Sequence, residues 1–486
     1  MAKRTAVIDI GSNSARMAIY EKESRFAFSL IKEIKSRVRI GEGAYENDGK
    51  LQDFAIKRAF EALSEFLQIA KNLQCRKVLC VATSAVRDAP NSNTFINEIK
   101  NKLNLKIRII DGNKEAYYGA LAVINMLPKF SEATTIDIGG GSTELVKIVN
   151  GKIVKTVSLD IGTVRLKELF FDNKKPNDEA NKFIAKKLSS LDKTFCTNTI
   201  IGIGGTIRAL GKLFIAKTDY PLSTIHGFEY GTKTSLDLIR KIAASSVLNL
   251  KSIGIKKDRY DTIREGCAIF GALVERLDAK KIITSGVGIR EGVYLSDILR
   301  SSGGKFPENF NLSMESLKAR FAPSVQEIKF MTKISEELFW KLKPLHKLND
   351  RFLHPLITAA KLASIGRALN FYQEHLHSAY FILNNLNYGF THQDKVLIST
   401  IVRFYGKKVY ESDIQVYKDL LPSIKEINWL VFILSLAKTL FTNGATENIK
   451  FELTGNFFHI ICPKPLYLVK SAIKNINKPE SFAIVL

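Results

Sequence analysis

The chain has 486 residues, of which 45% are hydrophobic and 25% are charged. This length predicts about two to four domains, and the composition provides for a core and argues against long disordered stretches. Lysine and arginine outnumber aspartate and glutamate by 72 to 48, and the resulting formal charge of +24 favours polyanions as partners.

Cysteine usage and hydropathy predict a reduced, cytoplasmic protein. The five cysteines are scattered and form no CxxC pair, which argues against disulfides and against a zinc site. The start of the chain, Met1 to Arg4, runs into a strand without a signal-peptide pattern. The most apolar run, Trp429 to Phe441, is shorter than the roughly 20 residues of a membrane span, so we expect a core helix and no membrane partner.

One short pattern, D-I-G-x-x-S, occurs twice. It spans residues 9–14 and again residues 137–142, an offset of 128 residues (137 − 9). Each copy lies between two apolar β-rich runs, which predicts a tight hairpin turn with a carboxylate at the end of the incoming strand. A repeat at this spacing predicts two similar half-domains that face each other.

The chemistry of these turns points to phosphate binding. Glycine lets backbone amides approach a ligand closely, and successive amides with Ser and Thr hydroxyls form an anion site. A nearby aspartate can hold a divalent cation. The alternative is two ordinary glycine-rich hairpin turns. The candidate phosphate-binding residues are Gly11, Ser12, Asn13, Ser14, Gly139, Gly140, Gly141, Ser142 and Thr143.

Between the two copies, the pattern alternates strands and helices. Apolar spacing predicts an amphipathic helix over 54–70, with Phe54, Ala59, Leu63, Phe66, Leu67 and Ala70 on or near one face. A strand over 78–82 follows and ends in the loop 83–88, and a helix is predicted over 92–103. A strand over 106–110 follows, and a helix opens with Glu115. This order is typical of an α/β fold with right-handed crossovers.

The second half repeats the theme. Asn150-Gly151 predicts a hairpin between two strands, and residues 158–166 close that hairpin and enter a helix. Residues 200–208 and 282–292 each give an apolar strand, a glycine turn and a helix start. Such turns can receive a nucleotide or phosphate, although many only allow close packing.

Residues 301–307 are small, polar and glycine-rich before a proline, which predicts a domain boundary. Beyond them, helical periodicity covers 325–341 and 356–369. The last stretch returns to strands and ends in a helix, which predicts a small α/β cap. The strands span 449–453 and 457–461, and the helix spans 468–475.

Three charged residues stand out at the ends of predicted strands. Arg87 can make bidentate contacts with phosphate oxygens, and its alternative is a solvated surface residue. Glu115 lies in a first helical turn at the carboxyl end of a strand, where ligands bind in α/β sheets, although the helix dipole alone also favours an acid there. Strand alternation puts Glu144 and Thr143 on different faces, so both cannot be surface residues.

Taken together, these motifs resemble the exopolyphosphatase/guanosine pentaphosphate phosphohydrolase (Ppx/GppA) family, within the actin-like ATPase and sugar-kinase superfamily. The pair IDIGSNSARM and IDIGGGSTEL with Glu115 between them is the most specific feature. The segments that carry the resemblance are 5–20, 82–87, 109–119, 135–147, 158–166, 201–210 and 284–293.

The resemblance implies a fold class and a domain order. We expect an α/β fold with two actin-like (ribonuclease H-like) domains, followed by a mostly α-helical HD-like domain and a small C-terminal α/β domain. The expected ranges are 1–125 and 126–300 for the actin-like domains, 308–425 for the helical domain and 426–486 for the cap.

The resemblance also implies an activity and roles for single residues. Glu115 matches the general base that activates the attacking water, and Arg87 matches an arginine near the transferred phosphoryl group. Asp137 and Glu144 match acids that hold Mg²⁺ (or Mn²⁺), and Asp9 would lie opposite them as a further metal residue. The implied reaction removes the terminal phosphate from inorganic polyphosphate, and from guanosine pentaphosphate to give the tetraphosphate.

The helical region departs from the family pattern. Longer members resemble a metal-dependent HD phosphohydrolase with a His-Asp pair, but here Ala363 and Ser364 occupy those positions. His375 and His377 remain downstream, and we expect them to be packing or surface groups. We therefore predict a helical domain without metal chemistry, which could bind the distal polyphosphate chain or form the interface of a homodimer.

Two other functions stay open at this point. The first is an actin-like ATPase or small-molecule kinase, with a nucleotide between the halves and Gly202 to Thr206 under its base. The second is a non-enzymatic regulator that binds polyanions or RNA. The leading expectation is an enzyme whose partners are inorganic polyphosphate and guanosine pentaphosphate, with no specific nucleic acid.

Overall fold

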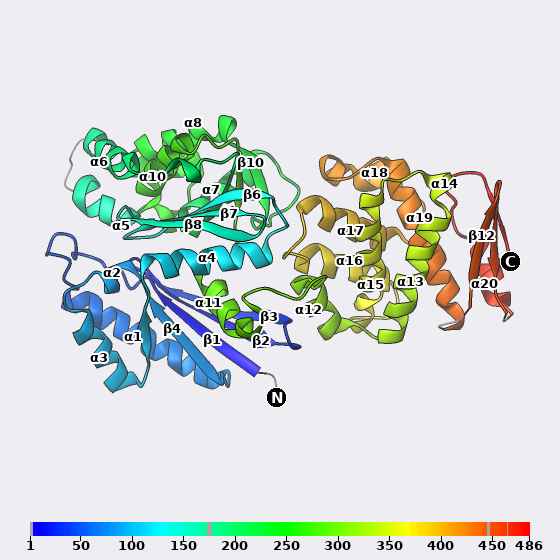
Figure 1. Cartoon of the computed structure of the whole chain (residues 1–486), viewed down its shortest axis with the longest axis horizontal. Helices are drawn as coiled ribbons and strands as arrows, with labels where there is room; N and C mark the ends of the chain where they lie inside the picture. The colour runs from blue at the N-terminus through cyan, green and yellow to red at the C-terminus, as the bar shows by residue number, and fades with distance from the viewer. Residues whose placement is uncertain (1–2, 173–176, 445–447, 464) are drawn as a thin grey trace. The chain divides into compact units, whose positions relative to one another are not determined.

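The computed structural model describes residues 3–172, 177–444, 448–463 and 465–486. Met1 and Ala2, which belong to the segment expected to lack a signal-peptide pattern, lie outside the described residues. The chain forms two compact units, Met1–Phe310 and Asn311–Leu486 (Figure 1). The first unit, here called the catalytic-fold unit, holds both copies of the repeated turn. The second is here called the helical unit.

The first half of the catalytic-fold unit is a sheet in the order β3-β2-β1-β4-β5. Strands β1, β2 and β3 are antiparallel, whereas β4 and β5 continue the sheet parallel to β1. The strands are β1 (Lys3–Ile10), β2 (Ala15–Lys22), β3 (Phe28–Ser36), β4 (Lys77–Ala82) and β5 (Ile107–Ile109), and the helices are α1 (Asp53–Asn72), α2 (Ser84–Arg87), α3 (Ser92–Leu103) and α4 (Gly112–Met126).

The second half repeats this arrangement in a sheet of the order β10-β11-β9-β6-β7-β8. The β6–β7 hairpin corresponds to β1–β2, and β9 lies parallel to β6 as β4 lies parallel to β1. The strands are β6 (Glu132–Ile138), β7 (Thr143–Val149), β8 (Lys152–Leu159), β9 (Thr199–Ile203), β10 (Phe228–Gly231) and β11 (Lys281–Thr284), and the helices are α5 (Thr163–Leu166), α6 (Asn177–Ser189), α7 (Gly204–Lys217), α8 (Thr232–Ala244), α9 (Leu250–Ile253), α10 (Ile263–Arg276) and α11 (Ile289–Ile298). The two similar half-domains expected from the repeat are therefore present.

Helix α1 confirms the predicted helix but corrects its apolar face. The buried stripe contains Ala55, Ala59, Leu63 and Phe66 at helical spacing. Phe54 was expected on this face, but it is 53% exposed. Because Phe54 lies one position outside the stripe, it points about 100° away from Ala55 around the helix.

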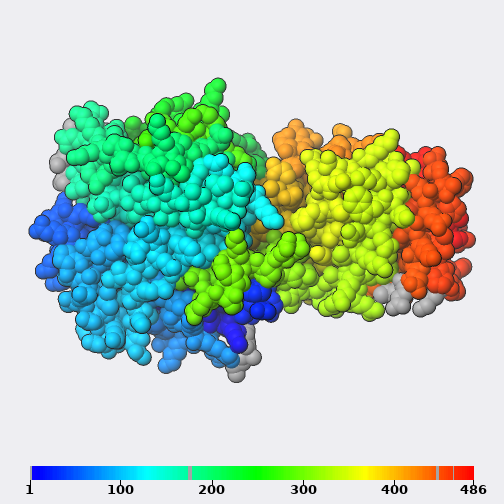
Figure 2. Space-filling view, viewed as in Figure 1, coloured from blue at the N-terminus to red at the C-terminus, as the bar shows by residue number. Residues whose placement is uncertain are grey.

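Two helices each pack against the sheet of the other half of the unit. Helix α4 comes from the first half and packs on β7 and β8, whereas α11 comes from the second half and packs on β1. The two helices cross where Gly292 meets the backbone of Tyr118, and a Cβ at Gly292 would lie 1.9 Å from the Tyr118 carbonyl oxygen. This contact requires glycine. On the side of the molecule shown in Figure 2, the blue surface of the first half borders the cyan-to-green surface of the second half.

The helical unit packs its helices around a core that contains α19. The helices of this unit are α12 (Leu312–Phe321), α13 (Val325–Lys341), α14 (Lys343–His346), α15 (Leu353–Leu362), α16 (Glu374–Asn385), α17 (His392–Phe404), α18 (Glu411–Ile414), α19 (Ile424–Leu440) and α20 (Tyr467–Ile473). The apolar run expected to be a core helix forms most of α19 and is buried from Trp429 to Ala437. Its capping box, with Ser423 and Glu426, fixes the start of the helix.

Within the described residues, no single helix is both long and apolar enough to cross a membrane. Only the pair 411–420 and 424–443 reaches the required length and composition together, and the two members are bent by 109°.

The predicted helix over 356–369 is corrected, because the structure ends α15 at Leu362. A 3₁₀ turn, Ile365–Ala368, follows. The Gly366 amide donates a hydrogen bond to Ser378 Oγ at 2.8 Å. This tertiary bond takes the place of a bond within the helix, which helical periodicity alone could not reveal.

The chain ends in a small sheet with the order β12-β13-β14. Strands β12 (Lys450–Thr454) and β13 (Phe457–Ile461) match the two predicted strands within one residue, and β14 (Ala483–Val485) was not predicted. The mixed architecture of two similar α/β halves, a helical region and a small α/β end agrees with the expected fold class.

Candidate active site

Both copies of the repeated pattern form the same backbone turn. The Gly11 amide donates to the Ser14 carbonyl at 3.2 Å, and the Gly139 amide donates to the Ser142 carbonyl at 2.9 Å. In both, an aspartate lies just before the turn and is paired across the hairpin. The partners differ: Asp9 pairs with Arg16, and Asp137 pairs with Glu144.

The two turns lie against each other. A Cβ at Gly140 would lie 2.7 Å from the Ser12 Cβ atom, and a Cβ at Gly141 would lie 2.3 Å from Ser84 Oγ and from the Tyr45 hydroxyl. Any side chain at either glycine would force the halves apart. The glycines are therefore required by the close approach of the two hairpins.

A cavity of about 160 Å³ lies between the turns. It brings together the predicted residues from both halves and from the start of α4. The predicted residues that line it are Asp9, Gly11, Ser12, Asn13, Ser14, Glu115, Asp137, Gly139, Gly140, Gly141 and Ser142. We call this space the cleft.

Glu115 is held in the first turn of α4. The Asp111 side chain caps this helix by accepting the Lys114 amide at 2.7 Å. Arg87 Nη1 donates to Glu115 Oε2 at 3.1 Å and to the Ile110 carbonyl at 3.2 Å. Arg87 thus contacts the glutamate behind the cleft and does not line the cleft surface.

Burial and a second acid raise the pKa of Glu115. Burial contributes most, the negative charge of Glu144 adds to it, and the charge of Arg87 opposes it. A buried carboxylate with a raised pKa is a stronger base than an exposed one. The position therefore suits proton abstraction from water.

Glu144 and Thr143 are both buried, and they lie behind the lining of the cleft. Ser158 Oγ donates to Glu144 Oε1 at 2.8 Å, and burial raises the pKa of Glu144 to about 7. The Thr143 hydroxyl donates to the Ile161 carbonyl at 2.6 Å. Because this bond uses the hydroxyl proton, Thr143 stabilises the turn and does not line the cleft.

The acids at the centre of the cleft suit a hard cation. Burial raises the pKa of Asp9, and burial raises the pKa of Asp137 to about 6. Across residues 3–172, 177–444, 448–463 and 465–486, no three acids, histidines or cysteines converge closely enough to hold a metal by themselves. Mg²⁺ usually takes one or two carboxylates and completes its shell with water and substrate phosphates. The donor set therefore fits Mg²⁺ bound together with a phosphate ligand.

Five cations line the same cleft, and the sequence analysis did not single them out. We call them the basic wall: Arg16, Lys35, Arg208, Arg259 and Arg290. Burial and the neighbouring cations lower the pKa of Arg16 to about 10 and that of Lys35 to about 8. Such crowding of positive charge suits a polyanionic ligand. Arg208 and Arg290 follow glycine-rich strand-to-helix turns, which is the signal that could have found them.

A second, larger chamber of about 630 Å³ shares Arg16, Arg208 and Arg259 with the cleft. Its lining adds lysines and apolar side chains from α7 and from residues 252–256. The basic wall therefore continues from the cleft into a wider space of the same unit.

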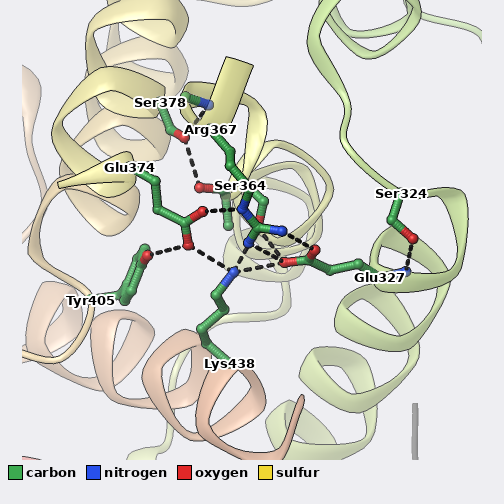
Figure 3. A network of polar contacts seen from close by, with 10 residues as sticks. Ser324, Glu327, Ser364, Arg367, Glu374, Ser378, Tyr405 and Lys438 are labelled. Atoms are coloured by element: carbon green, nitrogen blue, oxygen red, sulfur yellow. Dashed lines mark hydrogen bonds and ion pairs between the residues drawn. The ribbon is translucent and has the colours of Figure 1, made fainter. Parts of the chain in front are cut away.

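The helical unit holds a network of ion pairs around Ser364, one of the two residues that occupy the positions of the absent His-Asp pair (Figure 3). Lys438 Nζ donates to Ser364 Oγ at 2.7 Å and lies 2.7 Å from Glu327 and 2.9 Å from Glu374. Arg367 bridges the same two glutamates. An ammonium group and a guanidinium group therefore neutralise these carboxylates.

The two histidines noted downstream lie on α16. The ring of His375 packs edge-on against Tyr405 at 5.5 Å, and Gly366 packs closely against the His377 Cβ atom.

Comparisons with known proteins show which proteins this chain is similar to. A sequence model of the Ppx/GppA phosphatase family matches residues 18–301, and a model of domain III of Ppx/GppA phosphatases matches residues 311–454. A guanosine-5'-triphosphate,3'-diphosphate pyrophosphatase of Pseudoalteromonas translucida is 28% identical over 426 residues, which cover 84% of this chain and 81% of that protein.

Solved structures share the fold. The Aquifex aeolicus member of the Ppx/GppA family is 30% identical with a TM-score of 0.53, and the match covers 62% of this chain and 99% of that one. An exopolyphosphatase from Cytophaga hutchinsonii shares the fold at 23% identity, with a TM-score of 0.56 over 61% of this chain and 98% of that one.

Proposed function

This chain belongs to the Ppx/GppA phosphatase family, a family of hydrolases, and on that premise we propose that it removes the terminal phosphate from guanosine pentaphosphate and from inorganic polyphosphate. The printed name of the Pseudoalteromonas relative supports the first substrate. The second follows because both molecules present a terminal phosphoryl group on an anhydride bond.

One observation carries the proposal. The two glycine turns, Glu115, Asp9 and Asp137 line the same cleft as the basic wall. Phosphoryl transfer needs positioning, positive charge around the phosphate oxygens and a group that orients the nucleophile. The cleft provides all three within one space.

In the proposed reaction, the amides of Ser12 to Ser14 and of Gly140 to Ser142 hold the phosphate oxygens, while the Gly11 and Gly139 amides close the two turns. Glu115 takes a proton from water, whose oxygen attacks the terminal phosphorus. The bond from phosphorus to the bridging oxygen breaks, which gives orthophosphate, and the bridging oxygen stays on the leaving group, the shortened polyphosphate or guanosine tetraphosphate. Arg87 acts as a positioning residue, because its guanidinium hydrogen-bonds Glu115.

We assign Asp9, Asp137 and Glu144 to holding Mg²⁺ (or Mn²⁺), with Glu144 acting from behind the cleft lining. A bound cation supplies positive charge that stabilises the phosphate oxygens in the transition state. A cytoplasmic location and a homodimer stay predictions, as does the division of the chain at 125, 300 and 425.

The variant Glu115→Gln tests the function. Phosphate release from polyphosphate and from guanosine pentaphosphate is measured side by side with Mg²⁺ and without any acceptor. We expect the variant to lose about 100-fold to 10,000-fold in rate, as is typical when a general base is removed. The control is Glu98→Gln, whose carboxylate pairs on the surface with Lys102.

The result separates the alternatives. Equally slow release by wild type and variant would leave the polyanion-binding regulator as the better function. Phosphate transfer that requires an acceptor would favour a kinase. Rapid, Glu115-dependent release from both substrates supports the proposed hydrolase.

A further inference from the structure

One carboxylate lies among the cations of the basic wall. Glu33, on β3, accepts a hydrogen bond from Arg290 Nη1 at 2.6 Å. Arg16 Nη1 lies 3.7 Å from the same oxygen. These two arginines come from α11 and β2, so Glu33 joins cations from both halves of the unit.

Glu33 lies where the cleft and the larger chamber meet. Arg16 and Arg290 line the cleft, whereas Glu33 and Arg16 line the larger chamber. The Arg290 side chain is only 6% exposed, and Glu33 is 44% exposed. A ligand that fills the cleft and continues into the chamber therefore passes beside this carboxylate.

Glu33 is an anion in this setting. Burial raises its pKa, but the charges of Arg290, Arg16 and Arg208 outweigh burial and lower it. The carboxylate thus neutralises part of the positive charge that would otherwise meet phosphate oxygens. A phosphate beside Arg290 must share this guanidinium with Glu33.

We propose that Glu33 is an affinity-limiting residue that competes with phosphate for Arg290 and Arg16 and so limits how tightly the cleft retains polyanions and product orthophosphate. The inference rests on the proposed function, since it assumes phosphate ligands in the cleft. Like charges close together repel, so an ionised Glu33 weakens the binding of any phosphoryl group near it.

The variant Glu33→Gln removes the charge and keeps the shape. Binding of tripolyphosphate and of orthophosphate is measured by calorimetry at fixed ionic strength with Mg²⁺ present, in proteins that also carry Glu115→Gln so that the ligand is not hydrolysed. We expect both ligands to bind about tenfold more tightly, which corresponds to about 1.4 kcal/mol. Inhibition of hydrolysis by orthophosphate should strengthen by the same factor.

Two controls separate charge from shape and from general effects. Glu275→Gln removes a carboxylate of similar exposure, 48%, that also pairs with an arginine, Arg240, at 2.7 Å. It lies outside the lining of the cleft, and its affinities should equal those of wild type. Glu33→Asp keeps the charge, and we expect it to retain wild-type affinity.

The outcomes are distinct. Equal or weaker binding by Glu33→Gln would overturn the inference, because weaker binding would mean that Glu33 mainly orients the arginines. If the protein with Glu33 intact binds neither ligand, the proposed substrate class fails; if it binds both and Glu33→Gln does not bind them more tightly, the inference alone fails. Tighter binding by Glu33→Gln alone supports it, and melting temperatures measured for all variants verify that each is folded.

Discussion

Acidic side chains lie in the lining of the cleft and just behind it, where burial favours their neutral forms. Burial raises the pKa of Glu115, Asp137 and Glu144. The isolated fold therefore holds these groups at a cost in stability that a bound cation would relieve. Residues placed for chemistry in this way are expected to destabilise the protein that carries them.

Glu144→Gln tests this cost through pH. The pKa of Glu144 is raised to about 7 from its ordinary value of 4.5, so the folded state binds the proton more tightly than the unfolded state. The stabilising contribution of the proton is therefore complete below pH 4.5 and is lost as pH rises through 7. We expect the variant to be more stable than wild type by about 3 kcal/mol at pH 8 and by little at pH 5.

The measurement is urea unfolding of the catalytic-fold unit in a chelator at both pH values. Glu98→Gln serves again as the control for removing a carboxylate outside the cleft, because Glu98 pairs with Lys102 on α3. Phosphate release should fall in Glu144→Gln at every pH. A variant that is less stable than wild type at pH 8 would contradict the assigned cost.

The sequence could predict some of these residues and not others for a physical reason. The glycine turns and their aspartates are contiguous, so a repeated local pattern was enough to find them. The basic wall is assembled from β2, β3, α7, α11 and the segment before α10. Those five cations are far apart in the chain, and only the packing of the two halves brings them together.

At the scale of elements, an ion-pair network holds α13, α16 and α19 together around the 3₁₀ turn (Figure 3). Glu327 and Glu374 are almost buried, with side-chain exposures of 3% and 10%. Buried carboxylates are costly unless they are paired. Lys438 and Arg367 provide those partners from within the chain, so this part of the helical unit needs no cation from solution.

Lys438→Met tests the network. The substitution approximately keeps the length of the side chain and removes the ammonium, which leaves Arg367 as the cation that pairs with the two glutamates. We expect a loss of about 3 kcal/mol, because removing one partner of a buried pair leaves an uncompensated charge. The measurement is the thermal unfolding of the helical unit at neutral pH.

A control and a double variant sharpen the test. Lys318→Met removes a more exposed pair with Glu315, whose side chains are 24% and 28% exposed, and should cost less than about 1 kcal/mol. The double variant Glu327→Gln/Lys438→Met should recover part of the lost stability. No recovery would mean that Lys438 contributes mainly through packing.

The bounds of a helix could be predicted where its amphipathic periodicity alone determined where it begins and ends. The range 325–341 agrees with α13 at both ends. The range 356–369 failed, since the bond from Gly366 to Ser378 redirects the chain after α15. Local periodicity contains no information about that partner, which lies twelve residues further on.

For the whole molecule, the two units differ in what they carry. All residues assigned to chemistry lie within Met1–Phe310. The solved Aquifex relative is matched over 99% of its length by 62% of this chain, which indicates that a protein of about this unit's size can fold alone. The domain order could be read from the motifs and the boundary at 301–307, whereas the role of the helical unit could not.

We expect a protein of residues 1–310 to fold and to keep its Glu115-dependent phosphate release. Because the cleft and the basic wall belong to this unit, the rate with guanosine pentaphosphate should stay within about threefold of the full chain. If the helical unit binds the distal polyphosphate chain, removing it should raise KM for long polyphosphate and leave KM for tripolyphosphate unchanged. The measurement compares both KM values for the two proteins. Equal changes for long and short chains would argue against distal binding, and an inactive but folded fragment would show that chemistry depends on residues beyond Phe310.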